Sequence, residues 1–280
     1  MFDSPPRLTD TTFVILRDLI RRQMGIYFDH SKRDILADKL LPRLEHCRVW
    51  SFLDYYYHLK YDAHAQAEWQ MLADVLSVPE TFFWREADAL RLLTDVIVPH
   101  HYHSHPGRCL SPLRIWSAAC ATGEEPLSIA IALAEAGWFD KLPIQIYGTD
   151  ISARAIQQAK AGIYRDRAFR QLPLTLKHKY FQPVAPGWRI DETLHQRIHW
   201  DKANLLDQAA IQPYVCASVI FCRNLFIYFS LPTIQAVIDQ FYCVMPSPGY
   251  LFVSSSESLL KVKTPFRLTS IQDTFVYVKP

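Results

Sequence analysis

The 280-residue sequence is poor in glycine and has no long apolar run. Only eight residues are glycine, which argues against a linker-rich or disordered chain. The longest apolar stretch, residues 214–229, is interrupted by Arg223 and Asn224, so it falls short of the roughly 20 residues that a membrane helix needs. The first residues also lack a basic segment followed by an apolar one. Neither membrane insertion nor signal-directed export is therefore expected.

An excess of charge of one sign is also missing, because 30 basic residues face 28 acidic ones. No global field therefore marks the chain as a nucleic-acid-binding protein. The six cysteines show no Cys-x-x-Cys spacing, so we expect no metal and reduced thiols in the cytoplasm. Apolar side chains are plentiful: the chain is 50% hydrophobic, enough for one large core or two modest ones.

The rest of the chain is arranged around residues 116–126, Trp-Ser-Ala-Ala-Cys-Ala-Thr-Gly-Glu-Glu-Pro. A short buried strand is predicted at residues 113–116 and a helix at residues 127–136. A turn of small residues between them lets backbone N–H groups approach a ligand. Glu124 and Glu125 at the first helical turn would repel a phosphate, so a cationic ligand such as S-adenosylmethionine is favoured. The alternative is a capped helix with an acidic first turn.

The next predicted strand, residues 144–150, ends in Asp150, which lies 25 positions after Glu125. In nucleotide-binding α/β folds, a carboxylate at this place accepts two hydrogen bonds from a ribose diol. Asp150 could instead cap the helix that begins near residue 151, or do both. Together, the loop and the acidic residue favour an adenosine-containing ligand.

Polar side chains also follow two later predicted strands, residues 197–200 and 218–222. The candidates are Asn204, Arg223, Asn224 and Tyr228. In an open α/β sheet, ligands bind outside the carboxyl ends of the strands, so these residues should meet at the edge marked by Glu125 and Asp150. Each alone could be an ordinary turn, surface or core residue, but their convergence on one edge favours a site.

The first 75 residues carry helical apolar patterns and no convincing strand. The apolar positions are Phe13, Leu16, Ile20 and Met24, then Ile35, Leu36, Leu40 and Leu44. The second pattern also carries a basic row, made of Lys32, Arg33, Lys39 and Arg43. Such a row is usually a solvated face, and the alternative is a docking face for an acidic, elongated partner. Pro42 within this helix predicts a kink or a restart.

Residues 78–86 (VPETFFWRE) set a threonine and an arginine in an aromatic cluster between these helices and the sheet. Arg85 needs a polar partner there, and a ligand carboxylate could provide it. From residue 113 onward strands and helices alternate, which predicts a mostly parallel sheet with helices on both faces. The alternation lapses at residues 162–196, where we expect a small inserted antiparallel hairpin.

In combination and order, these motifs resemble the CheR-type chemoreceptor glutamate methyltransferases over essentially the whole chain. The motifs are Thr81-x-Phe-x-Arg85, Ser117–Pro126, Gly148–Ile151, Asn204-Leu205 and Phe221–Phe229. The resemblance implies an all-α N-terminal domain (1–75), a linker with a cofactor-contacting segment (76–107) and a Rossmann-like α/β methyltransferase domain (108–280) that contains an antiparallel β-subdomain (162–196). Val78–Thr81 and Asp150–Arg154 further resemble the Wsp-type subgroup, while Pro79 stands where the family often has asparagine.

The resemblance also implies a site, a reaction and a partner. It places S-adenosylmethionine contacts at Thr81, Arg85, Glu125, Asp150, Asn204, Leu205, Arg223 and Asn224, and it matches Tyr228 to a tyrosine that lines the reacting centre. Arg85 and Tyr228 are expected to position the substrate. The implied reaction methylates glutamates on the cytoplasmic helical region of a methyl-accepting chemoreceptor and yields S-adenosylhomocysteine. A monomeric cytoplasmic enzyme, recruited to receptor arrays and docked through Lys32, Arg33, Lys39 and Arg43, is expected.

Two other functions compete with this one. A non-catalytic module that senses S-adenosylmethionine or its product would keep the pocket, but the intact Arg223, Asn224 and Tyr228 argue against it. An RNA methyltransferase is disfavoured by the near-neutral charge.

Overall fold

The computed structural model describes residues 6–104 and 112–280. Four helices form the N-terminal region: α1 (Asp10–Met24), α2 (Arg33–Cys47), α3 (Phe52–Tyr61) and α4 (Ala65–Leu76), with a 3₁₀ turn at His30–Lys32 before α2. The Thr9 hydroxyl caps α1 by accepting from the Thr12 N–H, and Gly25 ends it at φ 82°. An all-α N-terminal region is confirmed.

The predicted apolar positions of these helices form their shared core, with one exception. All four on α1 are buried, as are Leu36, Leu40 and Leu44 on α2, whereas Ile35 is 52% exposed. The α2 helix also runs unbroken through Pro42, so a restart of the helix at this proline is wrong. The proline costs one backbone hydrogen bond, which the packing of three buried leucines on the same helix offsets.

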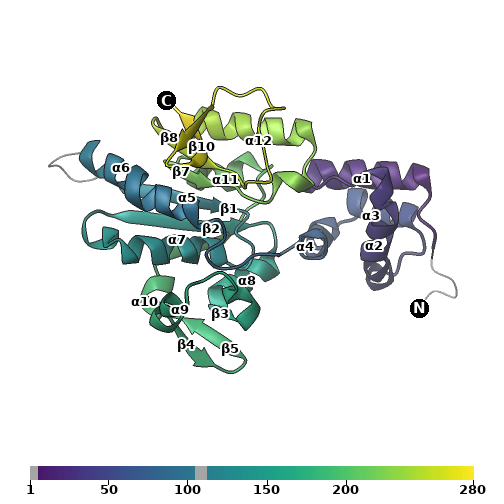
Figure 1. Ribbon diagram of the computed structural model, residues 1–280. Helices are drawn as coiled ribbons and strands as arrows, with labels where there is room; N and C mark the ends of the chain where they lie inside the picture. Colours follow the sequence, from purple (N-terminus) through teal and green to yellow (C-terminus); the bar gives the residue numbers. More distant parts are fainter. Residues whose placement is uncertain (1–5, 105–111) are drawn as a thin grey trace.

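The second region is built on a mixed seven-stranded sheet with the strand order β6-β2-β1-β7-β8-β10-β9 (Figure 1). The strands are β1 (Leu113–Ala118), β2 (Ile144–Asp150), β6 (Ile198–Lys202), β7 (Val219–Phe221), β8 (Gly249–Phe252), β9 (Arg267–Ile271) and β10 (Thr274–Lys279). The five strands β6, β2, β1, β7 and β8 pair in parallel, while β10 is antiparallel to both of its neighbours, β8 and β9. The sequence reading missed β9, which pairs only with β10 and carries mostly exposed side chains.

Helices cover both faces of this sheet (Figure 1). They are α5 (Ala87–Leu92), α6 (Val98–Ser104), α7 (Glu124–Glu135), α8 (Ala153–Ala161), α11 (Gln208–Val215) and α12 (Leu231–Val244). A π-helical turn, Leu93–Ile97, joins α5 to α6. The α7 helix is buried on nearly every side, which explains its Ala, Leu and Ile content.

The predicted insertion is a small antiparallel sheet of its own. Its strands are β3 (Ile163–Tyr164), β4 (Phe181–Val184) and β5 (Gly187–Ile190), in the order β3-β5-β4, accompanied by α9 (Leu174–Tyr180) and α10 (Glu192–His195). Figure 1 shows it as a lobe below the main sheet. The predicted α/β fold class, with an inserted β-subdomain and preceding helices, is confirmed.

The N-terminal helices meet the sheet region at the carboxyl ends of its strands (Figure 1). Ile26 forms an isolated β-bridge with Phe229, and the Tyr27 N–H donates to the Tyr228 carbonyl at 2.8 Å. The Asn204 amide adds a hydrogen bond to the carbonyl of Gln23 at 2.7 Å. These contacts fix the end of α1 against the edge where a ligand of an open sheet would bind. Among the described residues, no helix is both long and apolar enough to span a membrane.

Candidate functional site

The turn between β1 and α7 has an unusual backbone. Ala119, Ala121 and Gly123 all adopt positive φ angles, of 64°, 49° and 97°. Left-handed backbone at non-glycine residues is uncommon and concentrates at functional sites. Gly123 is required for a second reason, since a Cβ there would lie 2.8 Å from the Trp200 ring. The backbone conformation of this loop is therefore tightly constrained, and its side chains are small.

Asp150, at the end of β2, is tied to this loop. One carboxylate oxygen accepts from the Ala121 N–H at 2.9 Å and the other from the Ser152 N–H at 2.8 Å. Burial raises the pKa of Asp150, and the two backbone N–H donors oppose that rise. The helix cap is Ser152, whose hydroxyl accepts from the Ala155 N–H, so the capping alternative for Asp150 is wrong.

Arg223, directly after β7, lies at the centre of a buried charge cluster. Its side chain is 3% exposed and pairs with Glu86 at 2.9 Å and with Glu125 at 3.2 Å. It also donates to the Arg85 carbonyl at 3.0 Å, while its Nε is buried without a hydrogen-bond partner. Two carboxylates and a carbonyl therefore fix one guanidinium group, with one N–H left unused.

Glu125 connects this cluster to the loop. Besides the contact with Arg223, it accepts from the Ser117 hydroxyl at 2.6 Å. Burial raises the pKa of Glu125, and the neighbouring guanidinium works against that rise. Cys120, by contrast, is almost fully buried and burial raises the pKa of its thiol well above the usual value, so it is a packing residue.

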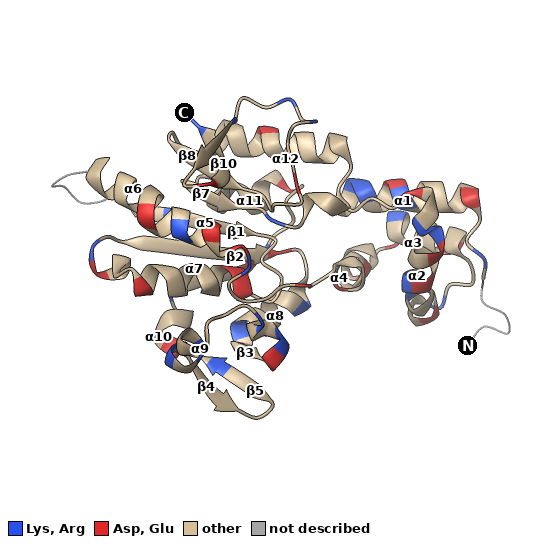
Figure 2. Ribbon diagram, viewed as in Figure 1, with Lys and Arg blue, Asp and Glu red and all other residues tan. Residues whose placement is uncertain are grey.

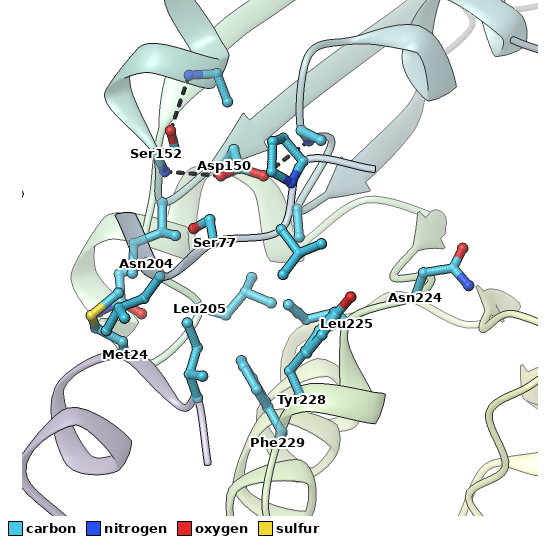
Figure 3. A pocket seen from close by; sticks show the side chains of 18 of the residues that line it. Met24, Ser77, Asp150, Ser152, Asn204, Leu205, Asn224, Leu225, Tyr228 and Phe229 are labelled. Atoms are coloured by element: carbon cyan, nitrogen blue, oxygen red, sulfur yellow. Dashed lines mark hydrogen bonds between the residues drawn. The ribbon is translucent and has the colours of Figure 1, made fainter. Parts of the chain in front are cut away.

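The main pocket lies between these groups and the N-terminal helices (Figure 3). Its lining comes from six segments: Met24 and Ile26, Leu76–Pro79, Ala119 with Ala121, Asp150–Ser152 with Ala155, Ala203–Leu205, and Arg223–Leu225 with Tyr228 and Phe229. In Figure 3, Asp150 lies across the cavity from Tyr228 and Phe229, with Asn204 and Met24 at one side and Asn224 at the other. The pocket is thus closed by both regions of the chain.

A second, more polar pocket adjoins the first and shares five lining residues with it: Val78, Ala119, Ala121, Arg223 and Asn224. Thr81, Arg85 and Glu125 lie on its remaining walls. The Arg85 guanidinium is 5.2 Å from the centre of the Phe82 ring and donates to the Glu80 carbonyl at 3.3 Å. Those contacts leave most of its five N–H donors available to a ligand.

The charges on the two pockets suit a ligand that carries charges of both signs. Two carboxylates, Glu125 and Asp150, line them with two guanidinium groups, Arg85 and Arg223, whereas the third carboxylate, Glu80, is paired with Arg167 and Arg170. S-adenosylmethionine, with a sulfonium, an ammonium and a carboxylate, carries a net charge of +1. The apolar walls around Leu205 and Ile151 suit an adenine ring, and the buried Asp150 carboxylate suits a ribose diol. The residues present therefore fit this group.

The structure brings all the predicted contact residues to one place. Thr81, Arg85, Glu125, Asp150, Asn204, Leu205, Arg223, Asn224 and Tyr228 all line one or both pockets. Pro79, where the resemblance would place asparagine, lines the main pocket with its ring.

The predicted basic docking row is not a free face. Arg43 is buried and forms a two-pronged ion pair with Glu68, at 2.9 and 2.5 Å, so its place in a docking face is wrong. Lys39 is half-buried and donates to the Val75 carbonyl at 2.9 Å. Only Lys32 is exposed, and Arg33 pairs with Asp10. The buried partners lie more than 20 residues away in sequence, so helical spacing gave no sign of them.

Sequence reasoning missed Glu257, which follows β8. Its carboxylate accepts from the N–H groups of Asn224 and Phe226, each at 2.7 Å, and from the N–H and hydroxyl of Ser254. It therefore holds the turn that carries Asn224, at φ 58°, in place. The only available signal was an acidic residue shortly after a buried strand, the same signal that identified Asp150.

This architecture and pocket define an α/β domain with a pocket at the carboxyl edge of its sheet, beside an all-α domain. Comparison with known families agrees: "CheR methyltransferase, SAM binding domain" matches residues 79–275, and "CheR methyltransferase, all-alpha domain" matches residues 11–77. The chain belongs to the CheR methyltransferase family and contains its S-adenosylmethionine-binding domain.

Several relatives are similar along most of their length. Chemotaxis protein methyltransferase 2 of Vibrio cholerae is 33% identical over 98% of this chain and 94% of its own. The protein of the same name from Pseudomonas aeruginosa is 34% identical over 90% and 88%. A probable biofilm formation methyltransferase WspC of Pseudomonas putida is 32% identical over 93% of this chain but only 60% of its own length. The predicted family resemblance is confirmed.

Proposed function

We propose that the protein transfers the methyl group of S-adenosylmethionine to glutamate side chains of a methyl-accepting chemoreceptor, giving glutamate methyl esters and S-adenosylhomocysteine. The observation that carries the proposal is the pair of adjoining pockets in which the carboxylates Asp150 and Glu125 and the guanidinium of Arg85 are brought together, closed by Tyr228 and by both regions of the chain. Membership of a methyltransferase family whose named relatives act in chemotaxis supports the same reaction class. The substrate is then on the cytoplasmic helical region of the receptor, and the enzyme works at receptor arrays as a monomer.

The acceptor needs no general base, because a glutamate carboxylate is already an anion at neutral pH. S-adenosylmethionine supplies an electrophilic methyl group on a sulfonium. The carboxylate oxygen forms a bond to the methyl carbon as the carbon–sulfur bond breaks, so no proton moves. Opposite charges are neutralised along this path, and a strongly polar pocket would stabilise reactants as much as the transition state. Alignment of the two reactants should therefore supply most of the rate enhancement.

For the nucleoside end of the donor, we assign three contacts. Asp150 accepts from the ribose hydroxyls, since its two oxygens each have one backbone donor and retain lone pairs toward the pocket. Asn204 and Leu205 hold the adenine, because they lie on the wall beside Asp150. The positive-φ loop at Ala121 gives the backbone room to approach the donor.

The amino-acid end of the donor is assigned to the adjoining pocket. Arg85 and Thr81 bind its carboxylate, and Glu125, held by Arg223, binds its ammonium group. Asn224 lies where the two pockets meet, next to the expected position of the sulfonium. Arg85 and Tyr228 then orient the acceptor carboxylate, since they flank this junction from opposite pockets.

The test is incubation with isotope-labelled S-adenosylmethionine and purified cytoplasmic receptor fragments, scored as base-labile label on the receptor. Replacing Tyr228 by Phe should lower kcat about tenfold through lost orientation, while affinity for S-adenosylhomocysteine stays within a few-fold. Tyr242→Phe is the matched control, because Tyr242 is a half-buried tyrosine outside both pockets.

Two outcomes would reject parts of this assignment. Donor binding by calorimetry without any receptor label would indicate a sensing module in place of an enzyme. A large loss of donor affinity in Tyr228→Phe, with kcat unchanged, would move Tyr228 from acceptor positioning to donor binding.

A further inference from the structure

The basic charges of the expected docking row, on α2 and the turn before it, are neutralised by neighbouring carboxylates. Residues 29–48 hold five Lys or Arg and four Asp or Glu, a formal sum of +1. Arg43 and Arg33 also pair with carboxylates outside this segment, on Glu68 and Asp10. With these two partners included, the sum is −1. An acidic partner would therefore find little net attraction on this face.

A different basic cluster lies at the end of α1. It consists of Arg17, Arg21 and Arg22 with Asp18, whose carboxylate is 3.2 Å from Arg17 and 3.9 Å from Arg21. Arg22 is exposed and donates from its Nε to the Asp18 carbonyl. Three guanidinium groups and one carboxylate give a formal sum of +2. Figure 2 shows this charge on the part of α1 that lies toward α12.

This cluster is continuous with the mouth of the main pocket. Arg17 lies over the Tyr27 ring at 5.3 Å, and the Tyr27 N–H donates to the Tyr228 carbonyl at 2.8 Å. The basic end of α1 is thus connected to Tyr228 through one residue. The α2 row has no contact of this kind among the described residues.

Exposed apolar side chains flank the pocket residues Tyr228 and Phe229 in sequence. Ile227 and Leu231, on either side of Tyr228 in sequence, are each 51% exposed, and Tyr27 is 36% exposed. Exposed aliphatic residues that are rimmed by charge are typical of a surface that binds a partner. A partner helix that presents a glutamate to Tyr228 would cover these residues and bring its other carboxylates toward Arg21 and Arg22.

We infer that the acceptor docks on the surface made by Arg21, Arg22, Tyr27, Ile227 and Leu231, here called the α1 rim, with Arg17 linking it to Tyr27 from beneath. This inference rests on the proposed function and adds the recognition element. The occupant is an amphipathic, acidic helical segment: its carboxylates face the arginines of α1, and its apolar residues cover Ile227 and Leu231. Methyl transfer then selects glutamates that have an apolar neighbour on the same helical face.

The test compares Arg22→Glu with Lys32→Glu on a receptor cytoplasmic fragment that the wild-type protein methylates. Both residues are exposed, and both changes alter the charge by the same two units. Arg22→Glu should raise the KM for the fragment about threefold to tenfold, with kcat and S-adenosylhomocysteine affinity unchanged. The KM of this variant should also increase less with ionic strength than the KM of the wild type. The reason is that salt screens the attraction between the arginines of α1 and the acidic segment, and the variant has less of that attraction to lose. Lys32→Glu should stay within about twofold of wild type.

A second pair tests the apolar part of the α1 rim. Leu231→Gln should raise the same KM, while Leu260→Gln should not, since Leu260 is 82% exposed and outside both pockets. Equal or larger effects of Lys32→Glu would return docking to α2 and overturn the inference. A wild-type dimer that Arg22→Glu dissociates would assign the α1 rim to self-association and overturn it too. If wild type labels no receptor fragment at all, the proposed function itself fails.

Discussion

Arg43 in the N-terminal helices and Arg223 at the edge of the sheet are both buried and both paired with carboxylates, yet their surroundings differ. Arg43 meets one carboxylate, Glu68, which is 5% exposed and also accepts from the Tyr55 hydroxyl. Arg223 meets two carboxylates that are 30% and 17% exposed, and keeps one unpaired N–H beside a pocket. The first cluster is closed and stabilises the helices, whereas the second is open to a ligand.

The electrostatics follow the same division. Burial alone would raise the pKa of Glu68, but the hydrogen bonds from Arg43 and Tyr55 outweigh it and lower that pKa. The pKa of Glu125 stays raised, since its burial outweighs the single guanidinium it shares with Glu86. A carboxylate that is under-compensated in this way can still gain from a cationic ligand.

The largest effect is expected from Arg43→Ala. Removing one partner of a buried pair leaves Glu68 charged and without a cation, which costs about 3–5 kcal/mol of unfolding free energy. Urea denaturation should show this loss, with donor affinity in the surviving folded protein unchanged. Lys32→Ala, at an exposed position on the same segment, is the control. A loss below about 1 kcal/mol would mean that the pair is no more stabilising than an exposed one.

The next effect concerns Glu124, a buried carboxyl group with no ion-pair partner among the described residues. Burial raises its pKa to about 7, above the usual value of 4.5. Because the folded state binds the proton more tightly, stability falls as pH rises from 4.5 to about 7 and then levels off. The loss is about 3 kcal/mol at most.

Glu124→Gln should remove this pH dependence and be more stable than wild type above about pH 7, as measured by chemical denaturation at several pH values. Glu135→Gln is the contrasting control, since Lys179 lowers the pKa of Glu135 and the sign is reversed. Parallel pH profiles for wild type and Glu124→Gln would show that Glu124 is charged in the folded protein.

Arg223→Gln should show most clearly how the open cluster differs from the closed one, because we expect it to affect ligand affinity more than stability. Water from the pocket can hydrate Glu86 and Glu125, so the stability loss should be about 1–2 kcal/mol, smaller than for Arg43→Ala. Affinity for S-adenosylhomocysteine should fall about tenfold to hundredfold, because Glu125 loses the group that orients it. Calorimetry measures the affinity. If stability falls as steeply as in Arg43→Ala while affinity holds, the open cluster would be structural as well.

The sequence predicts the position of Arg223, in the open cluster, better than that of Arg43, in the closed cluster, for a physical reason. Polar residues that directly follow buried strands must lie at the carboxyl edge of a parallel sheet, so Asp150, Asn204 and Arg223 could be placed together without knowing their partners. No such rule predicts the surroundings of Arg43. Helical spacing places it near Lys39, but whether it faces solvent depends on Glu68, 25 residues away.

The same limit explains the other misses. Met24 and Ile26 line the pocket because α1 packs against a turn some 200 residues later, a contact that no local pattern encodes. Ile35 fits the apolar spacing of α2 but lies on its exposed side. Local sequence patterns thus predicted the helices, most of the strands and the residues at the carboxyl edge of the sheet. The way in which the N-terminal helices pack against that edge could not be predicted from the sequence.

The smallest effect is expected from Tyr55→Phe in the closed cluster. The Tyr55 hydroxyl is fully buried and donates to the Glu68 oxygen that also accepts from the Arg43 Nε. Phenylalanine keeps the ring packing and the ion pair, so only one hydrogen bond is lost, at a cost of about 1–1.5 kcal/mol. Adding the change to Arg43→Ala should cost less than the sum of the two, because both act through Glu68. Full additivity in denaturation would show that Tyr55 and Arg43 stabilise the helices independently.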